Sequence, residues 1–206
     1  MNSQIGTVVE SGDRWATVTR STRETKVTVT LRLDGTGETD ISTGVGFYDH
    51  LLNSLAHHAL FDLDIEASGD LVIDEHHTVE DVALVIGAAL AEALGDRSGI
   101  ARFGDSSVPM DESVATAVVD VGGRPYAVVD LPFRGKRAGK LPLQLVEHIL
   151  ESFARAGGVT LNVKGRGRND HHLAEAAFKA LGRALRQAAE LDPRRDGVAS
   201  LKGTLE

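Results

Sequence analysis

Two short stretches of the sequence place paired histidines among carboxylates. Residues 74–81 read DEHHTVED and residues 169–176 read NDHHLAEA, and in each a glutamate follows three residues after the second histidine. Imidazole and carboxylate together suit Mn²⁺, Fe²⁺, Ni²⁺ or Zn²⁺. The chain contains no cysteine, which excludes thiolate zinc sites, iron–sulfur clusters and cysteine nucleophiles. Any metal must therefore be held by histidine and acidic side chains.

Helix geometry determines which of these groups can share an ion, because both motifs fall where a helix is expected to begin. Residues three or four apart lie on one face of a helix, so each glutamate can lie beside a histidine of its own motif. Adjacent helical residues point about 100° apart, so a histidine pair offers one ring to each of two ions. With one upstream histidine from each half, the expected metal ligands are His50, His76, His77, Glu80, His148, His171, His172 and Glu175.

Shared evenly, this set gives three histidines and one glutamate to each of two ions. Such a set leaves two positions of an octahedral ion open for substrate or water, whereas a closed tetrahedral zinc site has no open position. We therefore favour Mn²⁺. The neighbouring acids Asp74, Asp81 and Asp170 are expected to orient the ring N–H groups. His57 and His58 align with no histidine in the other half, and no metal role is expected for them.

The elements that position these residues occur twice. Period-2 alternation predicts strands and 3.6-residue spacing predicts helices, in the order strand, strand, helix, strand, helix. In the first half these elements are residues 15–20, 26–33, 49–60, 61–67 and 78–94. In the second half they are residues 113–121, 126–133, 143–156, 158–165 and 171–190, with the turn GGRP joining the first two strands.

Four segments of the first half align with segments of the second half, in the same order. DHLL at 49–52 falls on EHIL 98 residues later, and the two HH motifs lie 95 residues apart. We predict an α/β fold, an α+β sandwich, in which a duplicated strand–strand–helix–strand–helix unit forms a mixed sheet with helices packed on one face. Residues 1–100 and 101–206 would be pseudo-symmetric halves of one compact domain. Residues 135–140 and the tail after Asp192 are expected to be loops.

Composition limits the function classes. The net charge is −8, with one Trp and two Tyr in 206 residues, so we expect no nucleic-acid partner. No run of 18 apolar residues is present, so no membrane span is expected. The first twenty residues lack an apolar signal core, and we therefore expect a cytoplasmic protein.

Four segments together resemble the imidazoleglycerol-phosphate dehydratase family of histidine biosynthesis. They are GVGFYDHLLNSLAHHALFDL, DEHHTVED, GRNDHHLAEAAFKALGRAL and SLKGTL, and the similarity runs from about Arg20 to Leu205. The resemblance implies a Mn²⁺-dependent lyase with two Mn²⁺ per active site. It also implies a homo-oligomer of 24 subunits, whose active sites lie at subunit interfaces and take metal ligands from more than one chain.

The same resemblance assigns further residues. It places Glu24, in the segment RSTRET, in the site as the catalytic base, although spacing alone would indicate an ordinary strand-edge residue. Glu80 or Glu175 could also act as the base, but a carboxylate bound to metal is a weaker one. The implied phosphate-binding residues are Arg102, Arg124, Lys179, Ser200 and Lys202. Lys179 has independent support, because it lies four residues after Glu175 on the same helix face.

The implied reaction removes water from imidazole glycerol phosphate and yields imidazole acetol phosphate. The proton to be lost is beside no carbonyl, so the substrate's imidazole must accept the electrons. With metal at both ring nitrogens, the ring is an imidazolate that can expel the adjacent hydroxyl and give a diazafulvene-like intermediate. Two alternatives remain open from the residues: a two-metal phosphatase, whose ions sit about 4 Å apart, and a metal-stabilised scaffold without activity.

Overall fold

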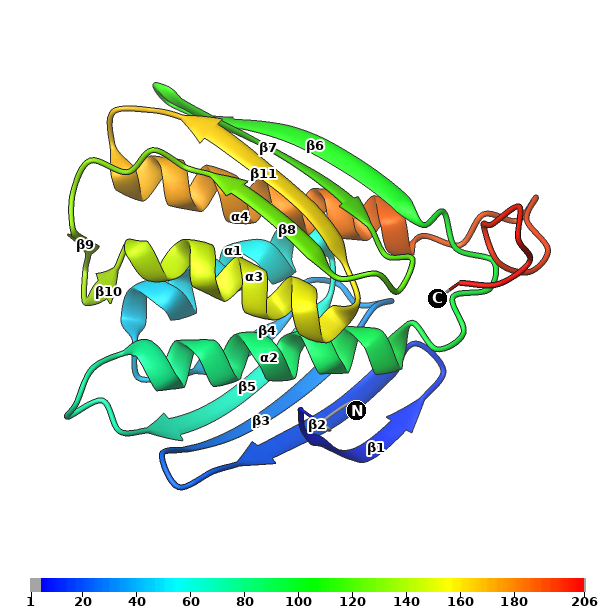
Figure 1. The fold of residues 1–206 in the computed structure, drawn as a ribbon, viewed down its shortest axis with the longest axis horizontal. Helices are drawn as coiled ribbons and strands as arrows, with labels where there is room; N and C mark the ends of the chain where they lie inside the picture. The colour runs from blue at the N-terminus through cyan, green and yellow to red at the C-terminus, as the bar shows by residue number, and fades with distance from the viewer. Residues whose placement is uncertain (1–4, 206) are drawn as a thin grey trace.

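Two β-sheets enclose a layer of helices in the computed structural model of the chain, which describes residues 5–205 (Figure 1). The first sheet has the strand order β1-β2-β3-β5-β4, and the second has the order β6-β7-β11-β8. The strands of the first sheet are β1 (Thr7–Gly12), β2 (Trp15–Ser21), β3 (Thr25–Arg32), β4 (Thr39–Ser42) and β5 (Asp62–Gly69). Those of the second are β6 (Phe103–Met110), β7 (Ser113–Asp120), β8 (Tyr126–Asp130) and β11 (Thr160–Arg166). β9 (Arg137–Ala138) and β10 (Leu141–Pro142) form a separate short pair.

Four helices fill the space between the sheets in the described part of the chain. They are α1 (Gly46–Ala59), α2 (His76–Ala93), α3 (Gln144–Gly157) and α4 (Asp170–Ala189). α2 packs on β2 and β3, and α4 packs on β6 and β7, so each sheet is covered on one face. No helix within residues 5–205 is long and apolar enough to cross a bilayer.

The predicted fold class is confirmed, with each half of the chain contributing its own mixed sheet. β4 runs parallel to β5, and β8 runs parallel to β11, whereas the other neighbours are antiparallel. The order β2-β3-β5-β4 in the first sheet therefore matches β6-β7-β11-β8 in the second. This match supports the proposal that residues 1–100 and 101–206 are pseudo-symmetric halves.

One strand pairing predicted from the sequence is wrong. β7 and β8 are not a hairpin across the GGRP turn, because β11 lies between them and β7 pairs with β6. β6 escaped detection because its two buried positions are Gly104 and Ser106, and only Val108 and Met110 near its end are apolar residues that pack on the core. α4 packs so closely there that a Cβ on Gly104 would lie 2.0 Å from the Ala184 carbonyl oxygen. β4 and the exposed strand β1 were also missed, and β9 lies inside the loop expected at 135–140.

The helices pair across the two halves. α1 of the first half packs on α4 of the second, and α3 of the second packs on α2 of the first. Both pairs approach closely at a glycine: a Cβ on Gly182 would lie 2.3 Å from the Leu55 carbonyl oxygen, and one on Gly87 2.5 Å from that of Phe153. As a result, the histidine of each upstream helix meets the HH motif of the other half.

Candidate metal centres and phosphate pocket

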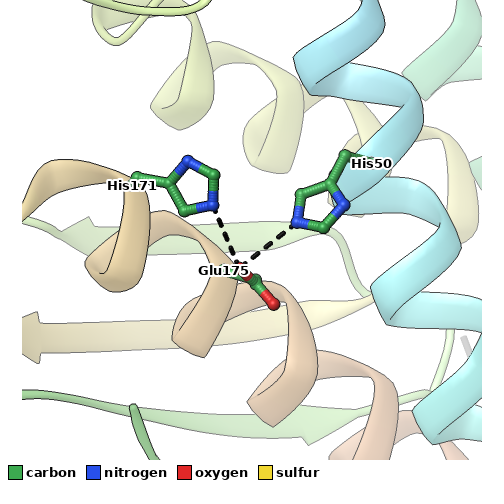
Figure 2. Close-up of side chains that lie close together, drawn as sticks. All are labelled: His50, His171 and Glu175. Carbon is green, nitrogen blue, oxygen red and sulfur yellow. Dashed lines mark ion pairs between the residues drawn. The ribbon is translucent and has the colours of Figure 1, made fainter. Parts of the chain in front are cut away.

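The first candidate metal centre joins α1 to α4 (Figure 2). The Nε2 atoms of His50 and His171 each lie 3.2 Å from Oε2 of Glu175. The ligand atoms of the three residues all lie within 4.8 Å of one another. The other carboxylate oxygen, Oε1, lies 2.6 Å from Nζ of Lys179. Burial alone would raise the pKa of Glu175, but hydrogen bonds from Lys179 and His50 outweigh burial and lower it.

The second candidate centre repeats this arrangement between α2 and α3. Nε2 of His76 lies 3.7 Å and Nε2 of His148 lies 3.4 Å from Oε2 of Glu80, and Arg155 lies 3.4 Å from the other oxygen. The Nε2 atom of His148 is buried and has no hydrogen-bond partner among the described residues. Two imidazoles and a carboxylate that converge on one point, with a buried nitrogen left unsatisfied, fit a bound metal cation.

Local sequence places these side chains in the first turns of their helices. Asn169 caps α4, and its side chain accepts hydrogen bonds from the backbone N–H groups of His171 and His172. Asp74 accepts one from the backbone of His76 at the start of α2, at 2.8 Å. Each glutamate then follows the first histidine by four residues, one helical turn, which brings the two side chains together.

The second histidine of each pair points away from both centres. The rings of His76 and His77 lie at 79° to each other, and those of His171 and His172 at 86°. Nδ1 of His77 lies 3.0 Å from Asp70, and Nδ1 of His172 lies 3.0 Å from Glu112. Within one chain, the structure therefore brings together six of the eight expected ligands, three in each centre.

The acids expected to orient the rings bond elsewhere. Asp74 accepts from the backbone N–H of His76, Asp81 accepts from the side chains of Arg20 and Thr25, and Asp170 accepts from the backbone N–H groups of Arg134 and Gly135. Asp70 and Glu112 hold the outward rings instead. Sequence reasoning missed Glu112 because it lies 60 residues from His172. It missed Asp70 because the contact with His77 depends on the path of the loop between β5 and α2, which no regular spacing indicates.

Glu24 lies at the tip of the β2–β3 hairpin, which is attached to α2. Arg20 and Thr25 both donate to the buried Asp81, and the Thr22 hydroxyl accepts from the backbone N–H groups of Glu24 and Thr25. The Glu24 side chain remains 54% exposed, with its carboxylate 3.7 Å from Nδ1 of His77. Glu24, Asp70 and His77 also place ligand atoms within 4.8 Å of one another. The segment RSTRET therefore fixes the backbone and leaves the carboxylate accessible.

Four of the five expected phosphate-binding residues line one cavity of about 390 Å³: Arg102, Arg124, Ser200 and Lys202. Arg102 donates to both oxygens of Asp120 at 2.7 and 2.9 Å and to the Ala199 carbonyl oxygen at 2.6 Å. The hydrogen bond with Asp120 raises the pKa of Arg102 above its usual value. An arginine has five N–H donors, so others remain for an anion.

The cavity is far from the first metal centre of the same chain. The backbone N–H of Arg102 donates to the Ala188 carbonyl oxygen, in the last turn of α4. A helical rise of 1.5 Å per residue puts His171 and Ala188 about 25 Å apart. Lys179, the fifth expected residue, lies beside Glu175 and does not line this cavity. A small substrate cannot reach both places in one chain.

Comparison with known proteins gives the same family as the motifs. The family model of imidazoleglycerol-phosphate dehydratase matches residues 43–185. The chain belongs to this family. The matched region contains all eight expected metal ligands of the dehydratase motifs, whereas Glu24, Ser200 and Lys202 lie outside it.

Individual members of the family align with more of the chain than the family model does. An imidazoleglycerol-phosphate dehydratase of Thermobifida fusca is 54% identical over 196 residues, covering 91% of this chain and 97% of the relative. One from Dehalococcoides mccartyi is 52% identical over 195 residues, covering 94% and 98%. The Staphylococcus aureus dehydratase crystal structure superposes with a TM-score of 0.78 at 34% identity, covering 85% of this chain and 98% of that one. The Pyrococcus furiosus dehydratase, in complex with (S)-C348, gives the same TM-score and identity, covering 91% and 99%.

Proposed function

We propose that this protein is an imidazoleglycerol-phosphate dehydratase, a hydro-lyase of histidine biosynthesis. It would remove water from imidazole glycerol phosphate and release imidazole acetol phosphate. The observation that carries the proposal is the pair of equivalent His–His–Glu centres, each assembled from both halves of the chain, in a member of this family. The separate cationic cavity supports a phosphorylated substrate, because arginine and lysine are the usual phosphate-binding side chains.

We propose two Mn²⁺ per active site, one for each kind of centre. His50, His171 and Glu175 would hold one ion, and His76, His148 and Glu80 the other. His77 and His172 point outward, and we propose that each supplies the third imidazole to a centre of another chain. When bound, the ions would act as Lewis acids that stabilise the substrate ring as an imidazolate.

The residues of the chain then have separate tasks. Arg102, Arg124, Ser200 and Lys202 would bind the phosphate, with Lys179 contributing from another chain. The anionic ring would expel the adjacent hydroxyl through a diazafulvene-like intermediate. Glu24 would take the proton from the next carbon, because its carboxylate is exposed beside the outward His77. Glu80 and Glu175 are weaker bases for this step, since each is already engaged by two histidines and a cation.

The proposed site requires several chains, which supports a closed assembly, for which we propose 24 subunits. Beside His77, the loop between β5 and α2 exposes apolar side chains: Val72 is 93% and Ile73 is 70% exposed. Such side chains next to an incomplete site favour contact with another copy of the chain. The cytoplasmic location remains a prediction from the sequence.

Metal content and activity measured together test this function. His76→Ala and His171→Ala should each lower the bound metal, determined by elemental analysis, and reduce dehydration of imidazole glycerol phosphate more than about 100-fold, since even residues behind metal ligands change activity by up to that factor. The matched control is His57→Ala, an exposed histidine outside both centres, which should leave metal and rate unchanged. Unaltered metal content in the ligand variants would contradict the proposal. Release of inorganic phosphate without dehydration would favour the phosphatase alternative.

A further inference from the structure

Two hairpins carry equivalent glutamates in different surroundings. Glu24 is the residue immediately before β3, and Glu112 is the residue immediately before β7. β3 and β7 occupy the same position in their sheets. Each carboxylate faces Nδ1 of the outward histidine in its own half, at 3.7 Å for Glu24 and 3.0 Å for Glu112. The duplication therefore supplies two glutamates, of which the proposed reaction uses Glu24.

Glu112 is held in place where Glu24 is not. Its Oε1 atom accepts from the backbone N–H groups of Arg168 and Asn169 at 3.1 and 2.8 Å, and from the Ser113 hydroxyl at 2.9 Å. Its Oε2 atom faces Nδ1 of His172. The side chain of Glu112 is 23% exposed, compared with 54% for Glu24. Glu112 is thus bound to the loop that leads into α4.

The connecting loops explain the difference. In the first half, residues 70–75 join β5 to α2, and Asp70 in this loop binds the outward His77. In the second half, the shorter loop of residues 167–169 reads GRN and contains no acid. His172 is held instead from the β6–β7 hairpin, where Glu112 lies 3.0 Å from Nδ1 and the exposed Asp111 lies 3.8 Å away. This leaves Glu24 free and Glu112 occupied.

We infer that Glu112 is a positioning residue that fixes the tautomer of His172, so that its Nε2 lone pair is presented to a metal ion. The inference rests on the proposed function. A carboxylate facing Nδ1 accepts a hydrogen bond there, which places the ring proton on Nδ1 and leaves Nε2 unprotonated. Groups of this kind behind metal-binding histidines change metal affinity by about 10–100-fold.

A glutamine at position 112 would reverse the effect. The two backbone N–H groups and the Ser113 hydroxyl hold the Oε1 position, so the amide oxygen of a glutamine must occupy it. The amide nitrogen would then face Nδ1 of His172 and donate to it. The ring proton would move to Nε2, where it blocks metal binding. An alanine removes the contact and leaves the ring free to adopt either tautomer.

Titration of the metal-free, full-length protein with Mn²⁺ tests the inference, with free Mn²⁺ measured by electron paramagnetic resonance. Glu112→Gln should weaken Mn²⁺ binding by about 10–100-fold, and Glu112→Ala should weaken it less. The matched control, Glu24→Gln, should bind Mn²⁺ as the wild type does, because Asp70 already holds His77. Thermal unfolding of the metal-free variants reports the fold independently of the metal.

Three results would overturn the assignment. Wild-type affinity in Glu112→Gln would show that the carboxylate does not set the tautomer. A larger loss in Glu112→Ala than in Glu112→Gln would indicate that packing matters and the ring proton does not. A wild-type protein that neither binds Mn²⁺ nor dehydrates the substrate would remove the proposed function, and this inference with it. If the wild-type protein binds Mn²⁺ and dehydrates the substrate, and Glu112→Gln binds Mn²⁺ equally well, the proposed function stands and only the inference about Glu112 is wrong.

Discussion

At the scale of single residues, each central glutamate has two oxygens in two different environments. Oε2 of Glu175 and of Glu80 faces two histidines that come from different helices. Oε1 of each faces a cation, Lys179 for Glu175 and Arg155 for Glu80. The cation neutralises part of the carboxylate charge from outside the centre. The cation comes from the same helix in one centre, where Lys179 follows Glu175 by four residues, and from the facing helix α3 in the other, where Arg155 approaches Glu80.

The proposed phosphate cavity, lined by Arg102, Arg124, Ser200 and Lys202, allows substrate binding to be tested separately from the chemistry. Lys202→Ala should raise KM at least about 10-fold with little change in kcat, because it removes one charge-assisted contact, worth about 1.5–3 kcal/mol, to a group that does not itself react. Steady-state kinetics measure both constants. Arg194→Ala is the matched control, since this tail arginine is 88% exposed and pairs with Asp192; it should leave both unchanged. A collapsed kcat with an unchanged KM would instead assign Lys202 to the reaction.

Residue types and spacing predicted the site residues whose partners lie one turn away on the same helix. His76 with Glu80, and His171 with Glu175 and Lys179, follow from turns of a helix whose existence the apolar periodicity already indicates. The roles of Asp70 and Glu112 could not be predicted in this way. Glu112 reaches His172 only because β7 and α4 pack together, and that approach depends on tertiary packing.

At the scale of elements, the helices were predictable and part of the second sheet was not. Strong apolar periodicity placed all four helices to within a few residues of their bounds. The strand β6 has glycine and serine at its buried positions, which gives no alternation of apolar residues. Without β6, the strand after the GGRP turn was assigned to the wrong neighbour. Close packing against a helix therefore removed the signal that identifies a strand.

The close crossing of α1 and α4 should control the first metal centre. Gly182→Ala would gain up to about 1 kcal/mol of helix propensity, but its Cβ would meet a backbone carbonyl at 2.3 Å, which no side-chain movement relieves. We expect a net destabilisation of about 1–3 kcal/mol, as in overpacked cores. The added Cβ would push α1 away from α4 and so move His50 away from Glu175, which should weaken metal binding at this centre. The centre with Glu80 should keep its ion.

Denaturant unfolding and metal content measure these two effects. Gly46→Ala is the matched control, because a Cβ on this helical residue meets nothing within 4 Å, and it should cost little stability. A Gly182→Ala protein with wild-type stability and full metal content would show that α1 can move away from α4 without consequence. In that case the helix crossing would not be what positions His50.

At the scale of the whole molecule, the pairing of helices across the halves makes each candidate metal centre depend on both halves of the chain. Neither half contains a complete centre, since His50 needs Glu175 and His148 needs Glu80. The phosphate cavity lies at the far end of α4 from the first centre. The duplication therefore produces two candidate centres of three ligands each, and in the proposed function neighbouring chains complete them.

Complementation between two inactive variants tests this sharing directly. The double variant Arg124→Ala, Lys202→Ala loses two cations of the proposed phosphate cavity. The other variant, His171→Ala, loses a proposed metal ligand. If every site combines the cavity of one chain with the centre of another, co-expression should yield mixed assemblies in which some sites are intact. Dehydration at low substrate concentration should then exceed that of either variant alone. Variants purified separately and mixed without subunit exchange are the control and should stay inactive. Mixed assemblies that co-purify yet show no recovered activity would place the whole site in one chain, against the separation of about 25 Å along α4.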